Sequence, residues 1–159
     1  MLGLFNKKEI VLYSPVNGQM MQLEEVSDQV FASHMMGDGV AFQVEGDTVY
    51  APCDGKVTFI AHTLHAFGMK TRNDAEILVH IGLDTVNLKG QGFQKLVEEG
   101  EKVKKGTPII QFDKAYMKER ELDLTTPMVI TSSSDYNLNL ISCGIVKKGE
   151  SQVMILNKK

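Results

Sequence analysis

The sequence contains few cysteines and no long hydrophobic run. Cys53 and Cys143 are the two cysteines among its 159 residues, and they form no CxxC pair. This spacing favours reduced thiols at small core positions of a cytosolic protein over a disulfide framework. No stretch approaches the roughly 20 apolar residues of a membrane-spanning helix, and the opening MLGLFNKKE is too short for a signal-peptide core. We therefore expect a cytoplasmic protein.

Charge of one sign is not concentrated anywhere in the chain. The formal net charge is −3 and neither sign runs in long blocks. The chain therefore lacks a basic tract that would neutralise nucleic-acid phosphates, and nucleic acid is not expected as a partner.

The length of the chain fits one domain. A chain of this size buries enough surface to fold around one core without disulfides or metal ions. We expect residues 10–159 to form this single domain and residues 1–9 to be a flexible N-terminal tail.

Short apolar and β-branched runs, bounded by Gly, Pro, Asn and Asp, fill most of the sequence. This spacing is typical of an all-β sandwich or barrel. Helical pattern is scarce: we predict one helix over Asp113–Leu124 with Asp113 as its N-cap, and helical turns within 24–31 and 93–98. The strands expected most clearly are Ile10–Tyr13, Val40–Val44, Lys56–Ala61, Glu76–Ile81, Pro108–Phe112, Met128–Thr131 and Gln152–Leu156.

Two pairs of short segments repeat imperfectly along the chain. SPVNG at 14–18 resembles APCDG at 51–55, and EGEKVKKG at 99–106 resembles IVKKGE at 145–150. Each segment places a glycine where a turn between strands needs a positive φ. The repeats indicate an internally duplicated β architecture, although unrelated turns of similar chemistry would produce the same matches.

Two histidines are expected to meet across a hairpin. Apolar runs lie on both sides of TRND at 71–74, and Asn and Asp favour a turn there. With the turn centred between Arg72 and Asn73, His65 lies directly opposite His80. Opposite residues share a face, with Cβ atoms roughly 4.5–5.5 Å apart, so this register brings the two imidazoles together.

Alternation along the hairpin predicts which side chains surround the two histidines. Residues 77, 79 and 81 are apolar and would face the core, so that their neighbours face outward. The outward face would then carry Thr63, His65, Phe67, Met69, Leu78 and His80.

A pair of imidazoles beside a hydroxyl suits a phosphohistidine. A neutral imidazole is a good nucleophile near pH 7 when one nitrogen attacks and a hydrogen bond fixes the other. The second imidazole and the Thr63 hydroxyl would donate to the phosphoryl oxygens, and an apolar rim would exclude water when a partner docks. Since phosphoryl transfer needs mainly positioning and charge stabilisation, we interpret His65 and His80 as a phosphoryl-transfer site.

Several motifs occur in a specific order and spacing between Ser14 and Ile155. They are FASHMMGDGVA at 31–41, APCDGKV at 51–57, HAF at 65–67, VHIGLDTVNLKGQGF at 79–93 and EEGEKVKKG at 98–106. In these motifs the chain resembles the glucose-type enzyme IIA of the bacterial phosphoenolpyruvate-dependent sugar phosphotransferase system. The resemblance implies an antiparallel β-sandwich with barrel character, a barrel-sandwich hybrid that is internally duplicated and has few short helical segments.

The same resemblance implies roles for three site residues. His80 matches the phosphorylated histidine, which accepts the phosphoryl group from phospho-HPr and passes it to a cysteine of a IIB domain for sugar uptake. His65 matches the supporting histidine, and Thr63 matches the threonine of its hydrogen-bond network. No cofactor is required, and the only membrane association implied is through the permease.

A partner-binding surface is also implied by the resemblance. Asp28 and Asp84 match the acidic residues that flank the family's site, where turn or capping roles are the alternatives. Ala61, Leu78 and Asn87 depart from the best-known members and alter the surface and its charge. This surface would receive phospho-HPr, the IIB domain and any regulatory proteins. Its hydrophobic residues are Val30, Phe31, Met36, Leu78 and Val86.

Three other interpretations stay open from the sequence. A zinc-dependent hydrolase would use His65 and His80 with a carboxylate, although no HxH ligand pair is present; zinc bridging the two histidines and a partner's carboxylate is compatible with the family. A biotinyl or lipoyl carrier would present a modified lysine on a hairpin tip, for which GMKTR at 68–72 is a weak match. The third is a purely structural interaction domain.

Overall fold

The computed structural model describes residues 9–141 and 144–159. Helices in this part are short: α1 is Gln29–Ala32, α2 is Lys114–Glu119, and the 3-10 turns are η2 (Leu23–Glu25), η3 (Thr85–Leu88) and η4 (Ser133–Asp135). The strands are β1 (Glu9–Tyr13), β2 (Gly18–Gln22), β3 (Asp38–Val44), β4 (Thr48–Tyr50), β5 (Gly55–Ile60), β6 (Ala66–Lys70), β7 (Glu76–His80), β8 (Phe93–Lys95), β9 (Lys102–Val103), β10 (Pro108–Phe112), β11 (Thr126–Ile130), β12 (Tyr136–Leu140), β13 (Gly144–Val146) and β14 (Gln152–Lys158).

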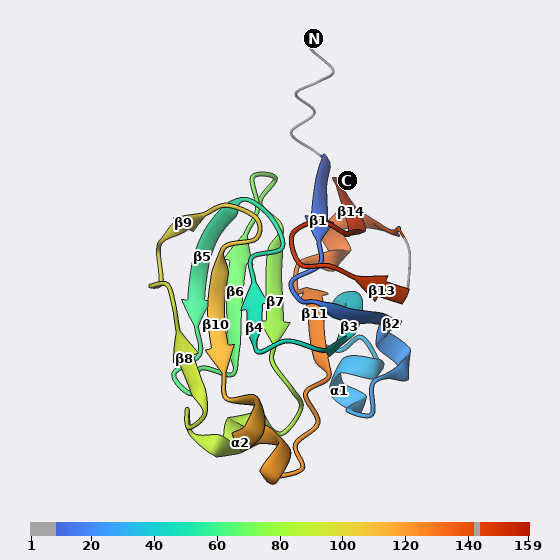
Figure 1. The fold of residues 1–159 in the computed structure, drawn as a ribbon. Coiled ribbons are helices and arrows are strands. Elements are labelled where there is room, and N and C mark those ends of the chain that lie inside the picture. The colour runs from blue at the N-terminus through green and yellow to red at the C-terminus, as the bar shows by residue number, and fades with distance from the viewer. Residues whose placement is uncertain (1–8, 142–143) are drawn as a thin grey trace.

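The strands form three antiparallel sheets. The largest has the order β13-β2-β3-β11-β7-β6-β5-β9, and the two smaller sheets have the orders β1-β14-β12 and β4-β10-β8. Figure 1 shows the N-terminal strand β1 beside the C-terminal strand β14, with which it pairs. The expectation of an all-β antiparallel sandwich with a few short helical segments is confirmed.

All seven expected strands are present, with shifts of one or two residues at some ends. The predicted helix over 113–124 begins correctly, because the Asp113 side chain accepts a hydrogen bond from the Tyr116 N–H at 3.0 Å. The expected end at Leu124 is wrong: the helix stops at Glu119, and Glu121 has a positive φ of 54° that no helix continues through. The helical turn expected at 93–98 is also wrong, since that segment begins with β8.

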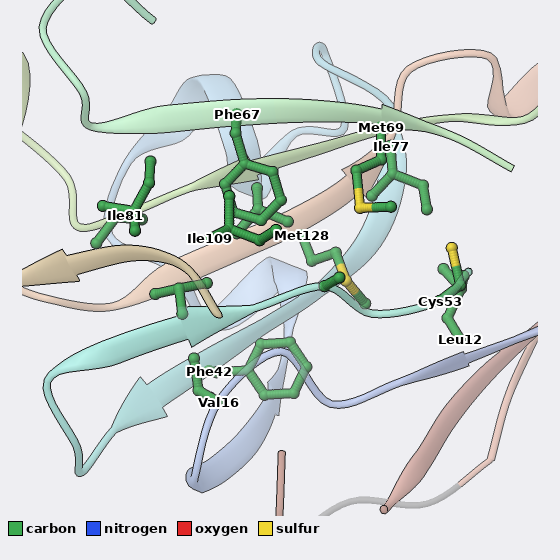
Figure 2. Close-up of a cluster of buried hydrophobic side chains, with 14 of the residues drawn as sticks. Leu12, Val16, Phe42, Cys53, Phe67, Met69, Ile77, Ile81, Ile109 and Met128 are labelled. Carbon is green, nitrogen blue, oxygen red and sulfur yellow. The ribbon is translucent and has the colours of Figure 1, made fainter. Parts of the chain in front are cut away.

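The main core lies between the large sheet and the two smaller ones. In Figure 2, Phe67, Met69 and Ile77 project from neighbouring strands into one apolar space. Cys53 lies in the same core with 4% of its surface exposed, and this burial raises the pKa of its thiol to about 12. Cys53 is therefore the small core residue that we expected, whereas Cys143 lies outside the described residues.

A second, smaller apolar cluster covers the other face of the large sheet. It holds Leu23, Val26, Phe31, Ala41, Leu83 and Val129, with Met21 and Leu78 packed against it. Its helical part comes from η2 and α1, which lie where a helical turn was expected within 24–31. This cluster fixes α1 beside the end of β7.

The repeated segments occupy equivalent places in a reciprocal hydrogen-bond pattern. The Tyr13 N–H donates to the Pro52 carbonyl, and the Tyr50 N–H donates to the Pro15 carbonyl. Likewise, the N–H groups of Gly106 and Gly149 donate to the first residue of each repeat, Ala51 and Ser14. Thus the sequence repeats mark an approximate internal duplication of the fold.

Glu9, the last residue of the expected N-terminal tail, is the first residue of β1. Residues 1–8 of the expected N-terminal tail lie outside the described residues, and Glu9 already pairs with Asn157 in β1. The described helices are too short, and not apolar enough, to serve as a membrane-spanning segment.

Candidate active site

His80 is the last residue of β7 and points to the outer face of the large sheet, half-buried. The neighbours Val79 and Ile81 are fully buried on the opposite face, as their alternation predicted. The Nδ1 atom of His80 lies 2.7 Å from the carbonyl oxygen of Gly82. Because a carbonyl only accepts, Nδ1 carries the proton and the unprotonated lone pair belongs to Nε2.

The Gly82 carbonyl is held in place by its own surroundings. Gly82 has a φ of 79°, and a Cβ there would lie 2.6 Å from Cγ2 of Thr85 and 3.0 Å from the Asp123 carbonyl oxygen. The next residue, Leu83, donates its N–H to that same Asp123 carbonyl at 3.0 Å. Only glycine fits this turn. The role of Gly82 was not predicted from the sequence, although a glycine directly after a strand end was a visible signal.

His65 comes from the loop that joins β5 to β6. Hydrogen bonds from the Ala61 N–H to the Ala66 carbonyl and from the Leu64 N–H to the Ala61 carbonyl close this loop. Leu64 takes a positive φ of 61° immediately before His65. The Thr63 hydroxyl lies 2.6 Å from Nδ1 of His65, so the expected contact between the two residues is present.

The two imidazoles are neighbours. The ring centroids of His65 and His80 are 4.8 Å apart, and the rings meet edge to face at 76°. One nitrogen of each ring is already engaged within its own loop. The remaining nitrogens therefore belong to one shared site on the outer face of the sheet.

The hairpin register that led to this pair is wrong by one residue. Ala66, not His65, lies opposite His80 in the β6–β7 ladder, and the Ile81 N–H donates to the His65 carbonyl at 2.6 Å. A one-residue shift normally sends a side chain to the other face. Here His65 precedes β6, and the positive φ at Leu64 frees its ring from the alternation of the strand.

The predicted faces of β6 are wrong for the same reason. Phe67 and Met69 were expected to lie beside the histidines, but they pair with Val79 and Ile77 and are 0% and 1% exposed in the core. The outward position opposite Leu78 belongs to Gly68. Of the expected apolar rim, only Leu78 remains on the outer face.

Both imidazoles favour the neutral state. Partial burial lowers the pKa of His80, and the Gly82 hydrogen bond and the nearby Asp28 carboxylate oppose that effect. Partial burial also lowers the pKa of His65, and the neighbouring His80 adds to the effect. A lowered pKa keeps the imidazoles uncharged, and hence nucleophilic, at neutral pH.

Helix α1 supplies a third side to the site. Asp28 caps it by accepting a hydrogen bond from the Val30 N–H at 2.8 Å, so the capping role that the sequence left open is present. The Phe31 ring packs against His80, with 5.1 Å between centroids at 60°. Phe31 is 5% exposed; it supports the His80 ring and offers little surface to a partner.

The other residues expected on the partner-binding surface differ in exposure. Val30, Met36 and Val86 are 44%, 37% and 46% exposed, while Leu78 is half-buried. Asp84 is exposed and precedes η3 without making a side-chain cap.

The remaining histidines lie outside this arrangement. His62 is exposed in the β5–β6 loop. His34 has a positive φ of 65°; its Nε2 atom lies 2.8 Å from Glu24 and its Nδ1 atom 2.8 Å from Asp38.

Two alternative interpretations find little support in the geometry. Within residues 9–141 and 144–159, no group of three His, Cys, Asp or Glu side chains is arranged to hold a metal ion, as a zinc hydrolase requires. Lys70, the lysine that a biotinyl or lipoyl carrier would modify, is the last residue of β6. It pairs with Lys56 and Glu76 in the sheet and does not lie in the turn between β6 and β7.

Comparison with known proteins gives a consistent result. Residues 10–136 match the family model described as phosphoenolpyruvate-dependent sugar phosphotransferase system, EIIA 1. The chain belongs to this family. It is a phosphotransferase component of that system and a phosphocarrier whose phosphoryl group is held on a histidine.

Individual relatives cover the chain almost completely. The glucose-specific EIIA component of Haemophilus influenzae is 37% identical over 99% of this chain and all of its own length. The glucoside-specific EIICBA component of Staphylococcus carnosus is 41% identical over 92% of this chain, which spans 21% of that longer protein. Among solved structures, glucose permease IIA from Mycoplasma capricolum superposes with a TM-score of 0.85 at 35% identity, over 93% of this chain and 96% of that one.

Proposed function

We propose that His80 accepts the phosphoryl group from phospho-HPr on Nε2 and passes it to a cysteine of a IIB domain. The observation that carries this proposal is the hydrogen bond from His80 Nδ1 to the Gly82 carbonyl. It leaves Nε2 as the nucleophilic nitrogen and fixes the plane of the ring.

Two displacements at phosphorus account for the relay. The Nε2 lone pair attacks phosphorus while the bond to the donor atom of phospho-HPr breaks, and the electron pair leaves with that donor. The cysteine thiolate of the IIB domain then attacks phosphorus, and the Nε2–phosphorus bond breaks. His80 is returned to its neutral form with Nδ1 still protonated, so the group acts repeatedly without a cofactor.

His65 and Thr63 are proposed to stabilise the phosphoryl group. When the Thr63 hydroxyl donates to Nδ1 of His65 at 2.6 Å, the His65 proton lies on Nε2. From a ring 4.8 Å away, that N–H is placed to donate to a phosphoryl oxygen on His80. Such donors aimed at developing charge supply most of what phosphoryl transfer requires.

The partner surface is proposed to surround His80. Val30, Met36 and Val86 are exposed apolar residues, which would exclude water around the transferring group once a partner covers them. Asp28 and Asp84 lie in the segments that flank the site and would interact with basic groups of phospho-HPr or the IIB domain. The name EIICBA for a relative that is four to five times longer supports a B component as the acceptor. Regulatory proteins would use this same surface.

Two further expectations complete the proposal. We propose that the protein acts in the cytoplasm, where it meets phospho-HPr, and that it approaches the membrane only through its permease. Residues 10–159 are proposed to be one domain, because β12, β13 and β14, which lie wholly or mostly beyond the family match, are joined to the sheets of β1 and β2.

Zinc is proposed as an occasional ligand that the chain does not require. The unengaged nitrogens of His65 and His80 provide two of the four ligands that zinc prefers. A partner's carboxylate would supply a third ligand, so zinc would strengthen a complex without taking part in phosphoryl transfer.

Radiolabelled phosphate transfer tests the proposal. His80→Ala should take up no label from phospho-HPr, whereas His65→Gln should accept label and pass it poorly to a IIB domain. His62→Gln is the matched control, because His62 lies exposed in the same loop as His65 and should behave as the wild type. Normal labelling of a folded His80→Ala variant would disprove the assignment.

A further inference from the structure

A groove lined by basic side chains opens at the far end of the β5–β6 hairpin from the histidines. Its volume is about 460 Å³, within the usual range for small-molecule sites. The charged side chains along its wall are Lys56, Lys70, Arg72, Lys102, Lys104 and Asp54. We call this the basic groove; its positive charge contrasts with the net charge of −3 of the whole chain.

Three of the lysines form a row across adjacent strands. Lys102 of β9 lies opposite Lys56 of β5, and Lys56 lies opposite Lys70 of β6. Opposite residues in antiparallel strands share a face at a Cβ separation of roughly 4.5–5.5 Å, and like charges placed in this way are destabilising. The fold therefore maintains a concentration of positive charge that works against its own stability.

In the described part of the chain, acidic side chains neutralise this row mainly at one end, where Glu76 lies opposite Lys70. Asp54 accepts a hydrogen bond from the Lys105 N–H at 2.9 Å, and Lys70 makes a marginal ion pair with Asp74 at 3.9 Å. Among residues 9–141 and 144–159, no ion pair within 4.0 Å involves Lys56, Lys102, Lys104 or Arg72.

Protection of a sheet edge explains only part of this pattern. Lysines on an edge strand discourage pairing with another chain, and β9 is the last strand of the large sheet. Lys56 and Lys70, however, lie on the inner strands β5 and β6. Their alignment with Lys102 calls for a different explanation.

We propose that the basic groove binds a small phosphate-bearing anion. Lysine ammonium groups and a guanidinium are the side chains that recognise phosphate, with Arg72 able to donate two parallel hydrogen bonds. The row spans three strands, or about 10 Å, and ends at Glu76, which lies opposite Lys70 on β7. This short span fits one or two phosphate groups and does not fit an extended polyanion.

The basic groove is separate from the histidine site. Glu76 and His80 lie at opposite ends of β7, about 13 Å apart along the strand. Both residues project from the same face, because four positions separate them. Anion binding and phosphorylation of His80 can therefore be measured independently on one protein.

Titration of the ¹⁵N-labelled full chain with inorganic phosphate and with glycerol 3-phosphate tests the proposal. We expect saturable shifts of the amide resonances of residues 54–56, 70–72 and 102–104, in buffers matched in ionic strength with chloride. The resonances of His65 and His80 should stay in place. Phosphate should also raise the melting temperature more than chloride does.

Removal of two lysines provides the decisive comparison. Lys56→Gln with Lys70→Gln should weaken phosphate binding about a hundredfold or more, because each of the two lost charged hydrogen bonds contributes at least about one factor of ten. The same variant should melt at a higher temperature than the wild type without phosphate, since like-charge repulsion is relieved. Lys118→Gln with Lys147→Gln removes the same charge outside the groove and should leave binding unchanged.

Four outcomes would overturn the proposal. Chloride could produce the same shifts as phosphate, or the two double variants could lose binding equally; either result would indicate general ionic screening. Saturable shifts confined to the histidines would place the anion at the other site. Binding to vesicles of phosphatidylglycerol without binding to either free anion would identify a membrane contact instead. Normal labelling of His80 in the Lys56→Gln, Lys70→Gln variant would show that this variant is folded. A loss of phosphate binding would then not reflect a loss of structure.

Discussion

Nδ1 of His80 and the backbone carbonyl of Gly82 are joined by a 2.7 Å hydrogen bond across a single intervening residue. This short link couples the tautomer of the proposed nucleophile to the conformation of the turn that ends β7. A hydrogen bond from the Leu83 N–H to the Asp123 carbonyl joins this turn to the segment before β11. The nucleophile is thus oriented by backbone atoms, and its orientation depends on the residue at position 82.

Gly82→Ala should therefore impair both folding and phosphorylation. The new Cβ would lie 2.6 Å from Thr85 and in a backbone conformation with a φ of 79°. We expect a loss of about 3 kcal/mol in the free energy of unfolding, measured by urea denaturation. Displacement of the carbonyl should also slow labelling of His80 in the fraction that remains folded.

Gly100→Ala separates strain from steric contact. Gly100 has a similar φ of 89°, but a Cβ there meets no atom within 4 Å. This variant should lose only about 1 kcal/mol and label at the wild-type rate. Equal effects of the two substitutions would mean that the Gly82 turn has no special role.

Phosphate uptake should be independent of pH above about 6.5 and fall below it. Burial lowers the pKa of His80 from an ordinary value of about 6.5, so the ring stays neutral until the solution is more acidic. Protonation then removes the Nε2 lone pair. The initial rate of labelling, measured from pH 5 to pH 8, should follow the NMR titration of the His80 ring.

Asp28→Asn should shift this profile further towards acid pH. The Asp28 carboxylate raises the pKa of His80 against the larger effect of burial, and asparagine removes that charge while still capping α1. The His80 titration should therefore move to lower pH, with α1 intact. A shift to higher pH, or none, would contradict the assigned electrostatic effect.

The sequence predicted the fold well because its signals are local. Turn residues bound each apolar run, and every expected strand is present. The N-cap at Asp113 was also visible. The end of α2 was not visible in the sequence. Met117 is fully buried, and the path of the chain after Glu119 depends on the packing of the core and not on the helical propensity of its residues.

The contact between His65 and His80 was predicted correctly, but from a strand register that is wrong by one residue. A symmetric turn was assumed, but the ladder places Ala66 opposite His80, and no local signal distinguishes registers one residue apart. The pair survives because the positive φ of Leu64 turns His65 out of the alternation. Backbone conformations of this kind are set by tertiary contacts, and a leucine gives no sign of them.

Thr63→Val should reduce the transfer of the phosphoryl group to the IIB domain. Without the hydroxyl, Nδ1 of His65 loses its 2.6 Å partner and the ring no longer has a preferred tautomer. The loss of one such hydrogen bond is worth about 1.4 kcal/mol, or about tenfold in rate. Stopped-flow measurement of transfer from the labelled protein gives this rate directly.

Thr63→Ser provides the control for this effect. Serine keeps the hydroxyl and should keep a transfer rate close to that of the wild type. A valine variant that transfers at the wild-type rate, or a serine variant that is as slow as the valine variant, would contradict the proposed role of the hydrogen bond to His65.

His34 should stabilise the fold more in mildly acidic than in alkaline solution. Its hydrogen bond to Glu24 raises the pKa of His34, against a smaller effect of burial, and Asp38 adds to the increase. The unfolded chain therefore loses this proton at lower pH than the folded chain does. The stabilisation is complete below about pH 6.5 and is lost as the pH rises through the folded value.

His34→Asn tests this pH dependence while preserving the backbone, because asparagine tolerates the positive φ of this position. At pH 5.5 the variant should be less stable than the wild type by about 0.5 kcal/mol, as expected for an exposed ion pair. At pH 8 the difference should be smaller in urea denaturation, because the raised pKa of His34 confines the stabilisation to the lower pH range. Adding Glu24→Gln to the variant should cost little more at either pH, because the interaction is already absent. A loss that is the same at both pH values would instead show that His34 acts through the conformation of its turn and not through its charge.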